Sequence, residues 1–323
     1  RGRRYAEGFP AERIEDVPAA SLSANPITAI PALLKIARGV DAAKKRFAEF
    51  NPALVAGFGG YPSFPALVAA RSRNIPILIH EQNSVLGRVN RAMATRAAIV
   101  ACGFERLDRL PAKAADRKHV VGNPVRLPIL AVRERPYPEA PAGGRLNVLI
   151  IGGSQGARLF GEVIPAAIAL LPPALRARLD IVHQVREEQV AHARGVYEKA
   201  QVSAEVAPFF TDMGQRLAAT HLVISRAGAS SVTELQVAGR PAILVPFAAA
   251  ADDHQTANAE GLTAVGAADL FTEEEFEPGV LASTLERRLS DPHGLAVRAA
   301  AARAAAKPEA AKNLADLAEG VAA

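Results

Sequence analysis

The sequence predicts an α/β protein built from two parallel-sheet domains that are each covered by helices. Short apolar, β-branched runs alternate with longer helical stretches between residues 52 and 247, a pattern typical of parallel strands joined by helical crossovers. A proline- and glycine-rich segment at 134–145 interrupts this alternation, which then starts again. The length of 323 residues is about twice that of a common domain and fits two such units.

In the first half, four apolar runs are expected to form the strands of one sheet. They cover residues 52–61, 75–83, 97–102 and 118–125. The segment ERPYPEAPAGGR at 134–145 predicts a linker, because its prolines and glycines do not fit inside a helix or a strand. The first domain is therefore placed at residues 1–136.

Five further strand-like runs follow the linker and are expected to form the second sheet. They begin at residues 146, 179, 204, 221 and 241, and the second domain is placed at 144–305. The tail at 306–323 is alanine-rich and helix-prone after Pro308, since proline ends the helix before it. We expect this last helix to cross back to the first domain.

Composition and charge exclude several classes of protein. Hydrophobic residues at 50% and charged residues at 22% indicate a packed chain rather than a disordered one. The single cysteine, Cys102, excludes an internal disulfide and favours a cytosolic protein. No apolar run approaches the roughly 18 to 20 residues that span a bilayer. The net charge of +5 fits acidic partners, but 5% aromatic residues without tryptophan argue against nucleic acid.

The first candidate ligand site is the glycine cluster IIGGSQGAR at 150–158, between an apolar strand and a helical stretch. Glycines permit a tight turn there, and free backbone amides at a helix start attract phosphate oxygens. A plain connecting turn explains the same residues equally well. The cluster is not the GxGxxG of dinucleotide enzymes, which disfavours a dehydrogenase.

The second candidate is VISRAGASSVTELQVAG at 223–239, where a strand becomes a helix. Ala229, Ser230 and Ser231 would present amides and hydroxyls to a diphosphate, and Glu234 could accept hydrogen bonds from ribose hydroxyls. Two structural explanations stay open. Ser231 and Glu234 match a capping box, and Arg226 would serve a structural ion pair as well as a ligand.

The third candidate is VPFAAAADDHQTANA at 245–259. The adjacent carboxylates of Asp252 and Asp253 could hold magnesium or manganese, but a helix N-cap is the favoured interpretation. His254 and Gln255 offer neutral donors and acceptors of the kind that bind sugar hydroxyls. This segment therefore indicates a carbohydrate ligand rather than a metal ion.

In the first half, AGFGGYPSFPA at 56–66 and IHEQNSVLGRVNR at 79–91 each follow an apolar strand. The carboxyl ends of parallel strands are where open α/β sheets bind ligands, so both should face the same crevice as the later loops. Asn83 is the better ligand contact, while His80 is more typical of a satisfied buried histidine than of a base. Arg126, in GNPVR, is available to a phosphate.

A further segment at 25–46 mixes apolar residues with lysines and arginines. An apolar patch edged with cations can rest on anionic lipid. A helix that packs on its own core and exposes its charges is the commoner explanation of such a pattern.

Taken in order, GGYPSFPA, HEQN, GNPVR, GGSQGAR, SRAGASSVTE and DDHQTANA resemble the MurG family of glycosyltransferases over nearly the whole chain. The resemblance implies a GT-B fold, with two doubly wound Rossmann-like domains facing a cleft. It implies inverting transfer of N-acetylglucosamine from UDP-N-acetylglucosamine to the 4-hydroxyl of undecaprenyl-diphosphate-linked N-acetylmuramyl pentapeptide, in peptidoglycan synthesis. It also implies no cofactor, no metal, and a peripheral location at the cytoplasmic face of the inner membrane, on an anionic surface.

The resemblance also assigns roles to residues of this sequence. The loop near Phe210 would receive uracil, Glu234 the ribose, and Gln255 with His254 the sugar. Arg126, Ser154 and residues 229–231 would hold the diphosphate, and Asn83 would reach the cleft from the opposite wall. The implied donor-binding residues are Asn83, Arg126, Ser154, Gln155, Phe210, Arg226, Ala229, Ser230, Ser231, Glu234, His254 and Gln255. The implied acceptor-side residues are Gly59, Gly60, Tyr61 and His80.

The sequence departs from the family pattern at its start. Family members begin with a strand and a GGTGGH loop that carries a histidine, the candidate catalytic base, whereas this chain begins at Arg1 without that motif. We therefore expect the first βα unit to be missing and leave the base unassigned. Two alternatives follow: a chain that binds the donor without catalysis, and a glycosyltransferase for another lipid acceptor, which GGSQGAR and HEQN disfavour.

Overall fold

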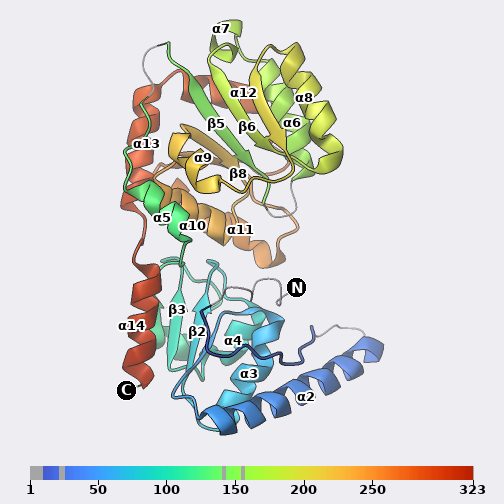
Figure 1. The fold of residues 1–323 in the computed structure, drawn as a ribbon, viewed down its shortest axis with the longest axis vertical. Coiled ribbons are helices and arrows are strands. Elements are labelled where there is room, and N and C mark those ends of the chain that lie inside the picture. The colour runs from blue at the N-terminus through green and yellow to red at the C-terminus, as the bar shows by residue number, and fades with distance from the viewer. Residues whose placement is uncertain (1–9, 22–25, 140–142, 154–156, 323) are drawn as a thin grey trace.

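The computed structural model describes residues 10–21, 26–139, 143–153 and 157–322. This part of the chain forms two lobes, one above the other along the long axis, and each lobe contains a parallel β-sheet (Figure 1). Every pairing between the named strands is parallel. The predicted α/β class with two parallel sheets is confirmed.

The sheet of the first domain has four described strands in the order β1-β2-β3-β4. Their bounds are β1 Val55–Gly57, β2 Ile77–Glu81, β3 Ile99–Cys102 and β4 Lys118–Val120. All five residues of β2 are buried, because helices cover both faces of the sheet. The strands are shorter than the apolar runs that predicted them, and the loops that follow β2 and β4 begin within those runs.

The two faces of this sheet are covered by helices that come from opposite ends of the sequence. One face carries α2 (Pro26–Phe50), α3 (Gly60–Ser72) and α4 (Arg88–Ala94), and η1 (Ala112–Arg117) precedes β4. The other face carries the C-terminal helix α14 (Ala310–Ala322), whose Leu314 lies in a cluster with Leu78 and Ile99. The chain thus ends beside its first domain (Figure 1).

The second sheet has the described order β10-β9-β8-β5-β6-β7. Its strands are β5 Leu146–Ile151, β6 Leu179–Gln184, β7 Ser203–Ala207, β8 Leu222–Ser225, β9 Ala242–Leu244 and β10 Ala268–Leu270. From β5 the chain winds one way to β6 and β7, then returns to β8 on the other side of β5. This reversal is a topological switch point, and open α/β sheets bind ligands in the crevice beside it.

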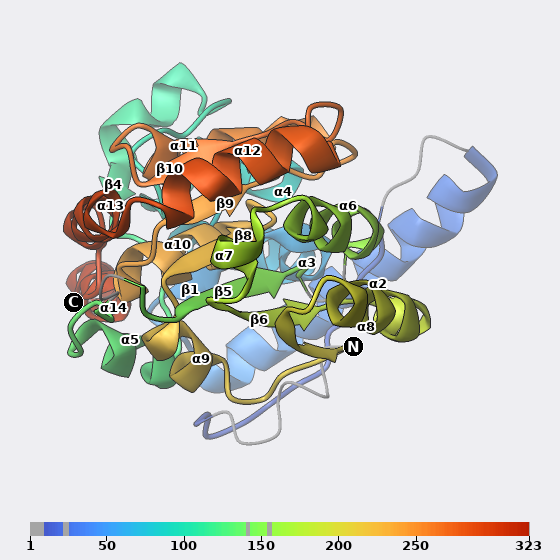
Figure 2. The ribbon, with the colours of Figure 1, turned by 90° about the horizontal axis from the view of Figure 1, so that it is seen from above.

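Helices lie on both faces of the second sheet, as the view from above shows (Figure 2). One face packs against α6 (Arg158–Ala169), α7 (Pro173–Arg176), α8 (Val190–Lys199) and α12 (Pro278–Leu289). The other packs against α5 (Leu127–Arg133), α9 (Met213–Ala219), α10 (Ala229–Ala238) and α11 (His254–Thr263). Helix α13 (Pro292–Ala304) contributes to both cores, and short 3₁₀ turns form η2 (Glu187–Gln189) and η3 (Ala251–Asp253).

The chain passes from the first domain to the second before the proline-rich segment 134–145, which was predicted to be the linker. Ile129 and Val132 of α5 are buried in a core of the second domain. The hydroxyl of Tyr137 donates to the carbonyl of His221, also in the second domain, at 2.6 Å. The crossing therefore lies between β4 and α5, and residues 134–139 lie against the second domain instead of joining the two.

Candidate active site

The two domains face each other across a cavity of about 890 Å³. It lies at the carboxyl ends of the strands, next to the switch point between β5 and β8. The first domain contributes Gln82 and Asn83, from the loop after β2. The second contributes Gly152, Gly153, Ala157, Arg158, Leu159, Arg186, Arg226, Gly228, Ala229, Ser230, Ser231, Phe247, His254, Gln255 and Glu273.

The first turn of α10 forms one wall of this cavity. The helix begins at Ala229, and its N-cap Gly228 has an extended backbone with φ −64° and ψ 146°. The amides at the start of a helix have no acceptor within the helix, and the helix dipole places partial positive charge there. Residues 229–231 therefore offer amides and two hydroxyls to an anionic group in the cavity.

The predicted capping box at Ser231 and Glu234 is wrong. Because the helix starts after Gly228, Ser231 is the third helical residue, and Gly228 has no side-chain cap. The carboxylate of Glu234 instead accepts from the guanidinium of Arg126, with Nη2 2.9 Å from Oε1. Burial raises the pKa of the Glu234 carboxyl above its usual range, and the charge of Arg126 offsets part of this effect.

Arg226 is a structural residue at the edge of the cavity. Its Nη2 lies 2.6 Å from the Glu273 carboxylate, and its Nη1 donates to the carbonyls of Val245 and Pro246 at 3.2 and 3.1 Å. The guanidinium also stacks on Phe160 at 5.0 Å from the ring centroid. These contacts tie the end of β8 to the end of β9, so they support the ion-pair interpretation of this arginine.

His254 and Gln255 lie at the start of α11 and line the cavity. The Gln255 Oε1 accepts from the amide of Phe247 at 2.9 Å, which leaves its amide nitrogen available to a ligand. The Nδ1 of His254 lies 2.7 Å from the carbonyl of Ala251, so this nitrogen donates and Nε2 accepts in the neutral ring. Both side chains therefore present hydrogen-bonding groups to the cavity, of the kind that bind sugar hydroxyls.

The preceding aspartates neither cap the helix by a side chain nor form a metal cluster. Asp253 is the N-cap of α11 but makes no side-chain cap hydrogen bond, and its Oδ1 accepts from the Thr256 hydroxyl at 2.7 Å. Asp252 lies 2.5 Å from Arg109 of the first domain. Within the described ranges there is no group of three or more His, Cys, Asp or Glu residues that could hold a metal ion.

The wall contributed by the first domain depends on the buried carboxylate of Glu81. Its Oε1 accepts from the backbone and side-chain amides of Asn83, both at 3.2 Å. Its Oε2 accepts from the Gly87 amide and from Asn90 Nδ2, both at 2.9 Å. Four hydrogen bonds to one carboxylate fix the loop after β2, so Asn83 is held in place at the cavity.

His80 does not reach the cavity, so we assign it to the scaffold. It is fully buried, its Nε2 lies 3.0 Å from the Gly122 carbonyl, and its Nδ1 lies 3.0 Å from the Gln82 amide. Burial lowers the pKa of the His80 ring. This geometry agrees with the prediction of a buried histidine whose ring nitrogens are hydrogen-bonded. It does not agree with the contact to the acceptor that the family resemblance implies.

The other implied residues lie outside this cavity. Gly59 and Gly60, with φ 78° and 70°, make the turn into α3, and Tyr61 is 51% exposed beside them. Phe210 is buried against Arg216, whose guanidinium carbon lies 4.1 Å from the ring centroid. The Arg126–Glu234 pair also lies outside the cavity lining. Ser154 and Gln155 fall outside the described residues.

The sequence-based predictions missed Asn258, which joins the two domains. It is fully buried and accepts from the amide of Ser84 at 2.8 Å. Its Nδ2 donates to the Asn83 side chain at 3.1 Å and to the carbonyl of Ala227 at 3.2 Å. One amide therefore bonds the loop after β2 to the turn before α10, and both elements line the cavity.

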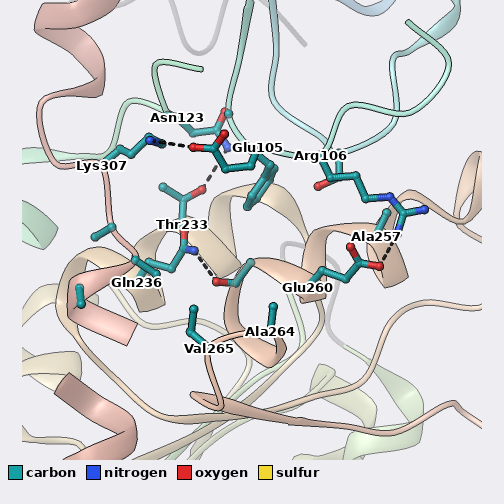
Figure 3. Close-up of a pocket in the computed structure, with 18 residues that line it drawn as sticks. Glu105, Arg106, Asn123, Thr233, Gln236, Ala257, Glu260, Ala264, Val265 and Lys307 are labelled. Atoms are coloured by element: carbon teal, nitrogen blue, oxygen red, sulfur yellow. Dashed lines mark hydrogen bonds and ion pairs between the residues drawn. The ribbon is translucent and has the colours of Figure 1, made fainter. Parts of the chain in front are cut away.

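A second interdomain cavity, of about 450 Å³, lies beside the segment between α13 and α14 and is shown in Figure 3. Asn123 donates to the Thr233 hydroxyl at 3.0 Å. Two ion pairs border the cavity, between Lys307 and Glu105 at 3.1 Å and between Arg106 and Glu260. These contacts connect the loops of the first domain to α10, α11 and the segment before α14.

Two family models match this chain, one in each half. Residues 147–314 match the model of the glycosyltransferase family 28 C-terminal domain, and residues 9–102 match that of the glycosyltransferase family 28 N-terminal domain. The first match covers nearly all of the second sheet, and the second covers strands β1 to β3 of the first sheet.

Curated relatives align along nearly the full chain. A protein of Maricaulis maris is 51% identical over 99% of this chain and 88% of its own length. One of Caulobacter vibrioides is 49% identical over the same shares. Both are named UDP-N-acetylglucosamine–N-acetylmuramyl-(pentapeptide) pyrophosphoryl-undecaprenol N-acetylglucosamine transferase.

Among solved structures, the crystal structure of Acinetobacter baumannii MurG is similar to this fold. It is 32% identical, with a TM-score of 0.79, and the match covers 99% of this chain and 87% of that one. The resemblance drawn from six sequence motifs is thereby confirmed. With its two facing parallel-sheet domains and these relatives, the chain belongs to the MurG family of GT-B glycosyltransferases.

Proposed function

We propose that this chain transfers N-acetylglucosamine from UDP-N-acetylglucosamine to the 4-hydroxyl of undecaprenyl-diphosphate-linked N-acetylmuramyl pentapeptide. The names of its relatives give this donor and this acceptor. The observation that carries the proposal is the cleft between the domains, with the start of α10 on one side and Asn83 on the other. A two-substrate transfer needs such a site, because donor and acceptor must meet where water is largely excluded.

In this proposal the donor lies mainly against the second domain. The diphosphate sits at the amides of residues 229–231, where the helix dipole favours negative charge. Glu234, one turn further along α10, accepts from the ribose hydroxyls, with uracil in the loop near Phe210. His254 and Gln255 bind the sugar, and Asn83 contacts it from the first domain. Ser154, Gln155 and Arg126 complete the donor site.

The proposed reaction inverts the anomeric carbon. The acceptor hydroxyl attacks the anomeric carbon from the face opposite UDP and gives its proton to a general base, which is not assigned here, while the bond from that carbon to UDP breaks and the departing diphosphate gains charge. Preorganised amides at the start of α10 stabilise that charge, and Arg126 adds a full positive charge. The proposed mechanism therefore uses no metal ion or other cofactor. Gly59, Gly60 and Tyr61 lie on the acceptor side of the first domain in this scheme.

We further propose that the protein acts as a peripheral protein at the cytoplasmic face of the inner membrane. Helix α2 buries Ala32, Ile36 and Ala43 but leaves Ile30, Leu33 and Leu34 exposed by 64%, 53% and 59%. Exposed Lys35 and Arg38 lie beside them. Apolar side chains flanked by cations suit an anionic lipid surface.

The place of α2 in the fold bears on this location. Helix α2 lies on the lower side of the first lobe, on the side away from the second lobe (Figure 1), so membrane contact there leaves the cleft open. No helix in the described parts of the chain is long and apolar enough to cross a membrane.

Through the supply of a peptidoglycan precursor, the activity would serve cell wall synthesis, cell shape and cell division.

A transfer assay tests this function. The chain is incubated with UDP-N-acetylglucosamine and the lipid-linked muramyl pentapeptide, with diacylglycerol as an alternative acceptor and UDP-glucose as an alternative donor. We expect a product heavier than the muramyl acceptor by one N-acetylhexosamine, formed equally well in the presence of EDTA. Product only on diacylglycerol, or donor binding without any transfer, would contradict the proposal.

A further inference from the structure

Three arginines line the cavity between the domains in the described part of the chain. Two of them form ion pairs with carboxylates of this chain. Arg226 pairs with Glu273 at 2.6 Å. Arg158 pairs with Glu162 at 2.7 Å. The third, Arg186, makes no side-chain hydrogen bond or ion pair with any residue that the structure describes, and its Nε is buried without a partner.

The fold explains why Arg186 lies at the cleft. It follows β6 directly, with extended backbone angles of φ −67° and ψ 152°, and precedes the short turn η2. Strands β5 and β6 pair in parallel, with Ile150 opposite His183. The loop after β6 therefore lies beside the glycine turn after β5, and Gly152, Gly153 and Arg186 line the same cavity.

An uncommitted, partly buried guanidinium favours an anionic ligand. A buried donor without an acceptor destabilises a protein, so a ligand oxygen that accepts from it contributes to binding. The planar guanidinium presents several donors in a fixed fork, which matches the oxygens of a phosphate better than a point charge does. The wall formed by α10 attracts the same kind of ligand.

We propose that Arg186 is a substrate-binding residue that donates hydrogen bonds to a pyrophosphoryl oxygen of a substrate in the cleft. The inference rests on the proposed function, in which both substrates carry a pyrophosphate, one in UDP-N-acetylglucosamine and one in the undecaprenyl-linked acceptor. Arg186 differs from Arg126, which lies outside the cavity lining and is paired with Glu234. It acts from the β6 side of the switch point, whereas the α10 amides act from the β8 side.

Arg186→Gln and Arg186→Lys are compared with the parent and with Arg287→Gln, a control at an exposed arginine of α12. Calorimetry gives the affinities of uridine, UMP and UDP for each protein. Initial rates give KM for UDP-N-acetylglucosamine and for the lipid acceptor. The nucleotide series isolates the phosphates, because its members share the same nucleoside.

If the donor pyrophosphate is the partner, Arg186→Gln weakens UDP binding by about 10- to 100-fold, the usual worth of a charge-assisted hydrogen bond. Uridine binding stays unchanged, and Arg186→Lys recovers part of the loss. If the acceptor pyrophosphate is the partner, the nucleotide series is unchanged and KM for the acceptor rises by a similar factor.

Two results would overturn the inference. One is a variant whose nucleotide series and acceptor KM both match the parent and Arg287→Gln. The other is an equal loss for uridine and UDP, which indicates general distortion of the site. Either result, obtained with a parent protein that transfers the sugar, leaves the proposed function standing. A parent that binds no UDP-sugar would contradict the function itself.

Discussion

Arg126, at the start of α5, forms an ion pair with Glu234 of α10. The Nη2 of Arg126 lies 2.9 Å from one oxygen of the Glu234 carboxylate and 3.2 Å from the other. Arg126 is 65% exposed at its side chain and Glu234 is 18% exposed. In the proposed function both residues bind the nucleotide, so the donor must exchange this ion pair for contacts to its phosphates and its ribose.

Replacing the carboxylate tests its role in binding the ribose. Glu234→Gln is expected to weaken binding of uridine and UDP alike, by about 1 to 3 kcal/mol, because a hydrogen-bonding carboxylate is lost. Calorimetry on both ligands measures the effect, and Glu286→Gln, at an exposed position of α12, is the matched control. Uridine binding as strong as in the parent would return Glu234 to a purely structural role.

The amide of Asn258 is expected to be required for the geometry of the cleft. Asn258→Asp retains an acceptor for the Ser84 amide but removes the donor to Asn83 and Ala227. The variant should lose about 1 to 3 kcal/mol of unfolding free energy, because buried acceptors are left unpaired, together with donor affinity. Urea denaturation and UDP-N-acetylglucosamine titration measure the two effects. Unchanged stability and unchanged affinity together would show that the contact between the domains is dispensable.

The buried His183 predicts a loss of stability in mild acid. Burial lowers its pKa to about 3 from the usual 6.5, so the folded protein keeps the ring neutral while the unfolded chain protonates it. Its stabilising effect is present above pH 6.5 and is lost as the pH falls toward 3. Between pH 7 and pH 5 the loss is about 2 kcal/mol at most.

His183→Asn removes the titrating ring and keeps a polar partner for the Tyr197 hydroxyl, which lies 2.9 Å from His183 Nδ1. The variant is expected to be less stable than the parent at pH 7 but to lose less stability on acidification. Urea denaturation of both proteins at pH 7 and pH 5 provides the comparison. Parallel losses in the two proteins would show that another group controls the acid response.

The exposed side chains of α2 predict the membrane contact. Leu33→Ser combined with Leu34→Ser should reduce binding to vesicles with anionic lipid by about tenfold or more, because apolar area is no longer transferred from water. Leu170→Ser, at a leucine that is 62% exposed on the second domain, is the control. Sedimentation with vesicles measures binding. Equal binding by the double variant and the parent would exclude α2 as the membrane surface.

The strand, turn and helix around Ala229 could be predicted because their signals are local. An apolar run ends at Ser225, small residues follow, and the helix begins within four residues. The exact start of α10 could not be predicted. Ser231 matches a capping pattern, but the helix begins at Ala229, directly after the extended Gly228. Strand β10 was not predicted, because its three residues include an aspartate and pair only with β9.

The contacts between residues far apart in the sequence had no local signal. Asn258 meets Asn83 from 175 positions away, and Arg126 meets Glu234 from 108 positions away. Polar residues on loops are ordinary in a sequence, and only the fold shows which of them are buried against each other. Arg186 had no local signal either. It is singled out only because Arg158 and Arg226, the other arginines of the cavity, are paired with carboxylates.

The central claim is that the start of α10 holds the diphosphate of an activated amino sugar. A crystal structure of the protein with UDP-N-acetylglucosamine tests it most directly. We expect phosphate oxygens within hydrogen-bonding distance of the backbone amides of residues 229–231, and the sugar beside His254 and Gln255. Density for the diphosphate outside the cleft, or against another element of the second domain, would contradict this account.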